Sequence, residues 1–113
     1  MFNITHLFAL IFAGISVGIA DALIKKVSMA DSFSSVFKSP WFLLVLFLYL
    51  IQIFIFIYIF RYNWNLGIAV NVQIVFYSIT VVLLGLFFFG ESLSLIQGLG
   101  IFIALTGVVL MSL

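Results

Sequence analysis

The organisation of this chain follows from one apolar stretch near its N-terminus, Gly14-Ile15-Ser16-Val17-Gly18-Ile19-Ala20-Asp21-Ala22-Leu23-Ile24-Lys25. On an α-helix, residues at positions i, i+4, i+7 and i+11 share one face. Four residues of the stretch stand at these offsets: Gly14, Gly18, Asp21 and Lys25. In a membrane helix, such a stripe of glycines and charges is unfavourable against lipid, so we expect it to face another helix or a polar cavity.

The composition indicates that lipid surrounds the chain. Of its 113 residues, 67% are hydrophobic and 6% are charged, and the mean hydropathy is +1.51. A typical soluble domain carries about 25% charged residues, far more than this chain has. The net charge of +1 excludes a nucleic-acid surface, which needs clustered lysines and arginines. The absence of cysteine excludes disulfides and thiolate metal sites.

Four apolar runs predict an all-α integral membrane fold with four transmembrane helices and short loops. A bilayer core about 30 Å thick needs about 20 apolar residues of helix. The runs lie at about 7–24, 41–60, 66–89 and 94–113, and we interpret 1–113 as a single four-helix membrane domain. Three lysines lie in or beside the first loop, against one arginine in the second. This bias predicts that the first loop faces the cytoplasm.

Turn and capping residues mark the boundaries of these helices. Ser39-Pro40 predicts the start of the second helix, because proline fits the first helical turn. Gly90 suits the left-handed residue that follows a helix, and Ser94 with Gln97 matches a capping box at the start of the fourth. The polar segment 27–39 predicts a loop with room for a short interfacial helix.

Polar residues inside the predicted spans need partners, because lipid offers none. Gln52 lies in the middle of the second span, where we expect it to form an interhelical hydrogen bond. The third span carries polar or small residues on two faces. One face holds Gln73, Tyr77 and Thr80, and the opposite face holds Gly67, Asn71, Ser78 and Gly85. This pattern favours a position inside a bundle for the third helix.

Small residues predict two close-packing surfaces. The Gly14-x-x-x-Gly18 spacing lets another helix backbone approach the first helix. In the fourth helix, Gly100, Ala104 and Gly107 lie on one face. We expect that second face to form the seam of a dimer, either with a second copy of the chain or with a related four-helix subunit.

Three short motifs occur in the second half of the chain, and they carry a resemblance to a known superfamily. They are Gly67-Ile68-Ala69, Phe88-Phe89-Gly90 and Gly100-(six residues)-Gly107-Val108. The small multidrug resistance family carries the same motifs in the same order at similar spacing. The chain therefore resembles the four-helix members of the drug/metabolite transporter superfamily. Glu91, followed by Gln97 and Gly100, looks more like the EamA-type branch, which includes small subunits that flip lipid-linked aminoarabinose.

The resemblance implies a proton-coupled transporter. This sequence departs from the family pattern, however, at the residues that bind the proton and the substrate. Small multidrug resistance proteins exchange protons for cations on a glutamate in the middle of helix one, and that position corresponds to Gly18 here. The carboxylate within the first apolar run of this chain is Asp21, about one turn nearer the loop. The tyrosine and tryptophan that the family carries early in helix three correspond to Val70 and Gln73. In EamA-type small subunits a polar residue often precedes the terminal lysine by four positions, as Asp21 precedes Lys25.

The candidate substrate- or proton-binding residues are Asp21, Gln73, Tyr77, Gly18 and Asn71. Two interpretations of Asp21 stay open: an i, i+4 pair with Lys25 at the interface, or a proton or cation site that faces the bundle interior. Glu91 is expected to complement the dipole of the fourth helix. The single histidine, His6, receives no role.

We expect a small secondary transporter of the drug/metabolite type, a multi-pass protein of a bacterial or archaeal plasma or inner membrane. It would move a small amphiphilic or cationic solute as a dimer. Two alternatives stay open: a subunit of a lipid-linked sugar flippase, and a non-transporting membrane assembly protein. The sequence carries no phosphate-binding loop, nucleophile elbow or metal-ligand spacing, so we expect no enzyme activity, no cofactor and no metal.

Overall fold

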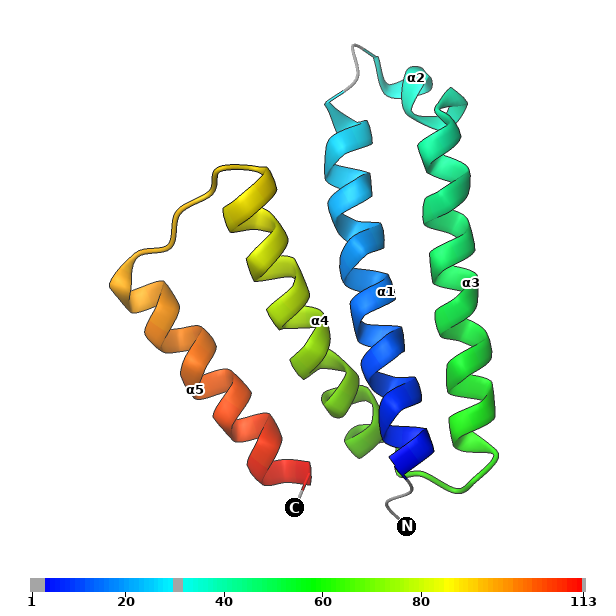
Figure 1. Ribbon diagram of the computed structural model, residues 1–113, viewed down its shortest axis with the longest axis vertical. Helices are drawn as coiled ribbons and strands as arrows, with labels where there is room; N and C mark the ends of the chain where they lie inside the picture. Colours follow the sequence, from blue (N-terminus) through cyan, green and yellow to red (C-terminus); the bar gives the residue numbers. More distant parts are fainter. Residues whose placement is uncertain (1–3, 30–31, 113) are drawn as a thin grey trace.

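A computed structural model describes residues 4–29 and 32–112 of the chain. Its helices are α1 (Ile4–Ser28), α2 (Phe33–Lys38), α3 (Pro40–Phe60), α4 (Leu66–Phe88) and α5 (Leu95–Ser112), and the described part contains no strand (Figure 1). The predicted all-α class is confirmed.

Three of the helices, α1, α3 and α4, are long and apolar enough to cross a membrane. The apolar part of α5, Leu95–Met111, is shorter. At 1.5 Å per residue it extends about 25 Å, less than the roughly 30 Å of a hydrocarbon core. The structure therefore supports a membrane protein with three spans, and the fourth span stays a prediction. The predicted end of that span, Leu113, lies outside the described residues.

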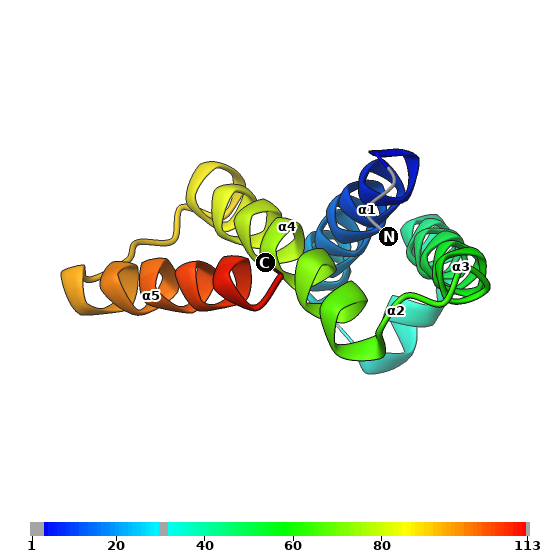
Figure 2. The same ribbon diagram turned by 90° about the horizontal axis from the view of Figure 1, so that it is seen from below.

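The four long helices lie in a row in the order α5, α4, α1, α3 (Figure 1). α5 and α4 run antiparallel, as do α1 and α3, whereas the central neighbours α4 and α1 run parallel (Figure 1). Seen from the end, the row bends but does not close into a bundle (Figure 2). The molecule measures 48 × 37 × 18 Å, and its shortest dimension is less than two helix diameters of about 10–12 Å each. Most of the apolar side chains are consequently exposed, as expected of a protein solvated by lipid.

The helix boundaries follow local capping chemistry. Ser39 caps α3 by accepting the Trp41 N–H at 3.3 Å, and Pro40 occupies the first turn. Ser94 and Gln97 form a complete capping box before α5: the Gln97 N–H donates to Ser94 Oγ at 3.1 Å, and the Ser94 N–H donates to Gln97 Oε1 at 3.0 Å. Gly90 has φ +63°. These predicted boundary signals are confirmed, and α2 is the short helix for which the polar segment had room.

α1 is longer than the range predicted for it. It packs between α3 and α4. It begins at Ile4 and continues through the two lysines to Ser28, whose hydroxyl donates to the Ile24 carbonyl at 2.7 Å. Its buried residues contact α3 on one side and α4 on the other. Leu10 lies in the main apolar cluster with Ile59, Trp64, Ala69 and Val72.

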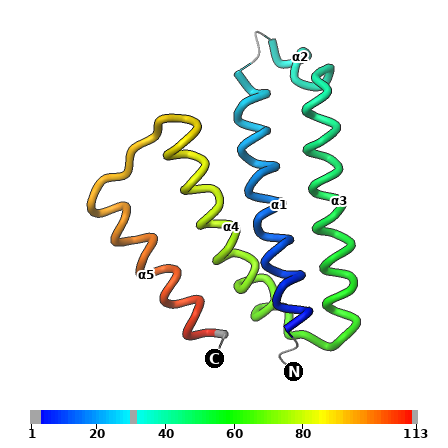
Figure 3. The backbone as a smooth tube through the Cα atoms, in the orientation of Figure 1, coloured from blue at the N-terminus to red at the C-terminus, as the bar shows by residue number. Residues whose placement is uncertain are grey.

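The predicted close approach of the Gly14-x-x-x-Gly18 face is present, and its partner is α4. A Cβ atom at Gly14 would lie 2.7 Å from the Gln73 carbonyl oxygen, and one at Gly18 would lie 2.6 Å from Thr80 Cγ2. Neither distance is sterically possible without movement, so only glycine permits this contact. From this contact the two helices diverge towards the ends formed by Ser28 and Phe88 (Figure 3).

α5 packs against α4 alone among the long helices and buries none of its described residues. A Cβ atom built at Gly100 or Gly107 would meet no atom within 4 Å. The face that we predict to be a dimer seam is therefore exposed in a single chain, and the dimer itself stays a prediction.

Candidate functional site

Asp21 joins three helices. It lies on α1, seven residues or about 10 Å before the helix ends at Ser28. Its Oδ1 accepts a hydrogen bond from the Tyr49 hydroxyl of α3, and its Oδ2 accepts one from the Tyr77 hydroxyl of α4. Of the two interpretations left open by the sequence, this geometry favours the one in which Asp21 faces the interior of the helix row.

Lys25 pairs with Glu91, not with Asp21. Its Nζ contacts Glu91 Oε2 and lies 4.9 Å from the centroid of the Phe89 ring. The two charged side chains are 46% and 49% exposed, so they lie at the exposed edge of the site. The prediction that Glu91 acts as a helix-start charge missed this contact, which joins residues 66 positions apart.

Two glycines allow Glu91 to reach Lys25. Gly90 takes the left-handed conformation, which reverses the chain direction after α4. The Glu91 N–H then donates to the Gly85 carbonyl at 3.0 Å, and the Glu91 side chain lies across Gly85. A Cβ atom at Gly85 would overlap Glu91 Oε1. The turn thus folds back over the end of α4 and carries the carboxylate to α1.

A cavity of about 150 Å³ separates Asp21 from this ion pair. Gly18, Asp21 and Lys25 line it from α1, and Leu84, Gly85 and Glu91 are among the residues that line it from the α4 side. A cavity of this size has room for a few water molecules. Because two carboxylates and one ammonium group border it, the site is suited to a proton, a small cation or water.

The structure separates Gln73 and Asn71 from the Asp21 cavity. Gln73 is 7% exposed, and its Nε2 donates to Gln52 Oε1 at 2.8 Å, which confirms the interhelical hydrogen bond predicted for Gln52. Asn71 Nδ2 donates to the Gly67 carbonyl of its own helix at 2.6 Å. Of the five candidate residues, Asp21, Tyr77 and Gly18 come together, and the other two do not.

Sequence reasoning missed Tyr49, although a signal was present. Tyr49 precedes Gln52 by three residues, so both side chains lie on one face of α3. Since Gln52 needs a polar partner within the membrane, the same face was expected to look inward. The hydroxyl group of Tyr49 was therefore to be expected on the inward face as well.

His6 also has a contact that the sequence did not suggest. It is 5% exposed, and its Nδ1 accepts a hydrogen bond from Trp64 Nε1 at 3.0 Å. The His6 ring lies 4.6 Å from the Tyr62 ring, centroid to centroid. Because Nδ1 is the acceptor, it carries no proton in this arrangement. His6 thereby connects the start of α1 to the turn between α3 and α4, and it takes no part in the Asp21 site.

Among residues 4–29 and 32–112, no group of three or more histidine, cysteine, aspartate or glutamate side chains is placed to hold a metal ion. Comparison of the chain with models of protein families, with curated proteins and with solved structures finds no match. The transporter resemblance therefore stays a prediction from short motifs, and the argument for function depends on the geometry of the site.

Proposed function

We propose that this chain is a small secondary transporter that moves a small amphiphilic or cationic solute across a cell membrane, with Asp21 as its exchange site. The observation that supports this proposal is the carboxylate of Asp21, which is hydrogen-bonded to two other helices and borders a cavity shared with Lys25 and Glu91. A charged side chain costs roughly 3 kcal/mol at the centre of a transmembrane helix, so such residues usually serve a function. The cost is smaller at the depth of Asp21, where two tyrosine hydroxyls donate hydrogen bonds to the carboxylate.

Protonation of Asp21 would change its contacts with α3 and α4. The ionised carboxylate accepts from both tyrosine hydroxyls, Tyr49 and Tyr77. A protonated carboxyl group carries one O–H donor in place of an acceptor site, so it disfavours one of these two hydrogen bonds. Binding of a proton or a cation at Asp21 would therefore loosen the link between helices. This is the coupling that an exchange mechanism needs.

The Lys25–Glu91 pair is placed to control access to Asp21 from the loop end. Both side chains border the same cavity as Asp21, and about half of each is exposed. In this proposal, separation of the pair opens the cavity to water, and its formation closes it. The two glycines at the end of α4 would let the turn move without losing the helix.

A second copy would complete the transport path. A row of helices 18 Å thick leaves both of its faces open. Many transporters place an inverted repeat around a site near the midplane. We propose that a second chain, inserted in the opposite orientation, or a related subunit supplies this repeat, and that the exposed small residues of α5 form part of the seam.

Proton-coupled flux in proteoliposomes tests this proposal. A pH-sensitive dye is trapped inside the vesicles, and small organic cations such as methylammonium and ethidium are added outside under a pH gradient. We expect the natural chain to exchange protons for at least one of them, and Asp21→Asn to abolish the exchange. Lys38→Gln, which removes a charge away from the cavity, is the matched control and should leave it intact. Unchanged flux with unchanged pH dependence in Asp21→Asn would remove the coupling role.

A further inference from the structure

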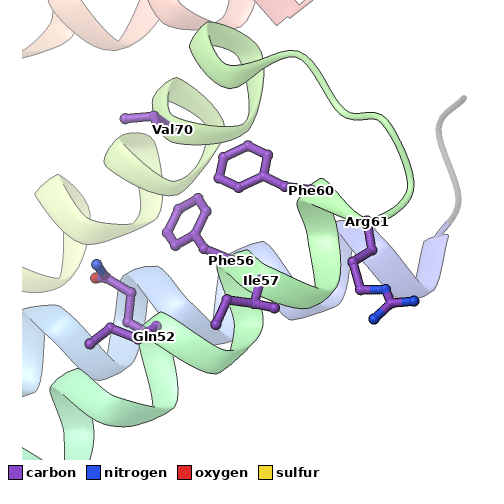
Figure 4. A pocket seen from close by; sticks show the side chains of 7 residues that line it. Gln52, Phe56, Ile57, Phe60, Arg61 and Val70 are labelled. Carbon is purple, nitrogen blue, oxygen red and sulfur yellow. The ribbon is translucent and has the colours of Figure 1, made fainter.

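A groove of about 650 Å³ lies between α3 and α4, on the half of the molecule remote from the Asp21 cavity (Figure 4). Phe56 and Phe60 of α3 and Val70 of α4 line it. Gln52 lies towards one end and Arg61 at the other, where α3 ends (Figure 4). The groove is thus an apolar channel along the helix with a cation at its outer end.

The length and depth of this groove match a lipid chain. Arg61 directly follows the last residue of α3, so it lies where a membrane helix meets the headgroups. Gln52 lies nine residues earlier, about 13 Å deeper at 1.5 Å per residue. The amide oxygen of Gln52 is already bonded to Gln73 of α4, which holds the inner end of the groove together. Between these ends, the walls offer hydrocarbon contact alone.

The charge of Arg61 lacks an internal partner. Among the residues that the structure describes, Arg61 forms no ion pair, whereas Lys25 pairs with Glu91 and Lys26 lies 4.4 Å from the centroid of the Trp41 ring. The two acidic groups of the described chain, Asp21 and Glu91, both lie at the other end of the molecule. A guanidinium group presents a planar fork of donors that fits a phosphate in bidentate fashion. Since the described residues offer Arg61 no carboxylate, its guanidinium is available to an anion from outside the chain.

We propose that this groove binds one anionic phospholipid, with its phosphate on Arg61 and an acyl chain along Phe56, Phe60 and Val70. The headgroup supplies a negative charge that the described residues lack at this end, and the acyl chain covers the apolar wall between α3 and α4. This site does not depend on transport at Asp21, so it stands or fails independently of the proposed function.

Native mass spectrometry of the full chain in detergent micelles tests this site. The probes are phosphatidylglycerol and phosphatidylcholine with identical acyl chains. We expect phosphatidylglycerol to bind about tenfold more tightly, because its net negative charge is paired with the guanidinium. Arg61→Gln should abolish the difference between the two lipids, with the larger loss of affinity for phosphatidylglycerol. Val70→Phe, which narrows the groove without changing charge, should weaken both lipids.

Lys38→Gln is the matched control, since it removes an equal charge from an exposed position at the other end of the molecule. It should keep the preference for phosphatidylglycerol. Three results would overturn the proposal: a preserved preference in Arg61→Gln, an equal loss in Lys38→Gln, or competition by soluble glycerol phosphate as strong as that by the lipid. The first would mean that Arg61 does not hold the headgroup, the second that charge anywhere on the chain attracts the lipid, and the third that the groove contributes nothing.

Discussion

The close contact between α1 and α4 is the feature of the fold that a substitution adding a single carbon atom tests most directly. In Gly14→Ala, the new Cβ atom would lie 2.7 Å from the Gln73 carbonyl oxygen and 3.0 Å from the Tyr77 nitrogen. An ordinary contact begins at 3.4 Å, so the backbone of α4 must retreat by about 0.7 Å, the difference between 3.4 and 2.7. Both neighbours are backbone atoms, so no side-chain rotation can relieve the clash.

The expected cost of this substitution follows from two opposing effects. Overpacking in a close contact typically costs about 1–3 kcal/mol. Alanine in place of glycine within a helix raises the free energy of unfolding by about 0.5–1 kcal/mol, because it reduces the conformational freedom of the unfolded chain. We therefore expect Gly14→Ala to lower the free energy of unfolding by about 1–2 kcal/mol.

Gly98→Ala is the matched control for this prediction. A Cβ atom at Gly98 would meet no atom within 4 Å, so only the favourable helix effect applies. Denaturation by sodium dodecyl sulfate in mixed micelles, followed by helical circular dichroism, measures both variants against the natural chain. Gly98→Ala should be equal or more stable, and Gly14→Ala should be clearly less stable. If the two substitutions had the same effect, the close approach of α1 and α4 would be wrong.

Two further predictions concern individual hydrogen bonds. Tyr77→Phe removes one of the two donors to Asp21 and should cost about 0.6–1.7 kcal/mol, the range measured for polar contacts between membrane helices; the same micelle denaturation checks it, and a cost no greater than that of an exposed Tyr→Phe change would contradict the contact. Trp64→Phe keeps an aromatic ring but removes the donor to His6, and should cost about 1 kcal/mol. In that second case, a His6→Ala background should make the substitution less costly, and full additivity of the two changes would argue against the hydrogen bond.

The sequence was sufficient for features that depend on neighbours along the chain. Ser39-Pro40, Gly90 and the Ser94–Gln97 capping box each set a helix boundary within a few residues. Such signals are readable because the partners of a capping side chain are backbone groups of the same turn. The apolar runs likewise indicated the long helices, since the length of a membrane helix follows from the thickness of the bilayer.

The partners of the charged side chains were not readable in this way. Lys25 has an aspartate four residues earlier on its own helix, and the i, i+4 spacing made that pair plausible. Its actual partner, Glu91, lies 66 residues away. Which of the two carboxylates pairs with Lys25 depends on how far α1 and α4 diverge beyond the Gly18 contact and on the reversal of the chain at Gly90. Both are properties of helix packing, which the sequence spacing does not contain.

The polar second face of α4 shows why a polar residue in a membrane span is an incomplete guide to its surroundings. Polar groups on two faces predicted helices or a wet cavity on both sides of α4. The first face does meet other helices: Tyr77 and Thr80 contact α1, and Gln73 donates to Gln52 of α3. On the second face, however, Asn71 donates to the Gly67 carbonyl one turn earlier and thereby satisfies a donor within its own helix. A short amide side chain can bond to the carbonyl four residues earlier and then needs no neighbouring helix. Longer polar side chains such as Gln73 and Tyr77 are the better predictors of helix contacts, because their partners lie on another helix.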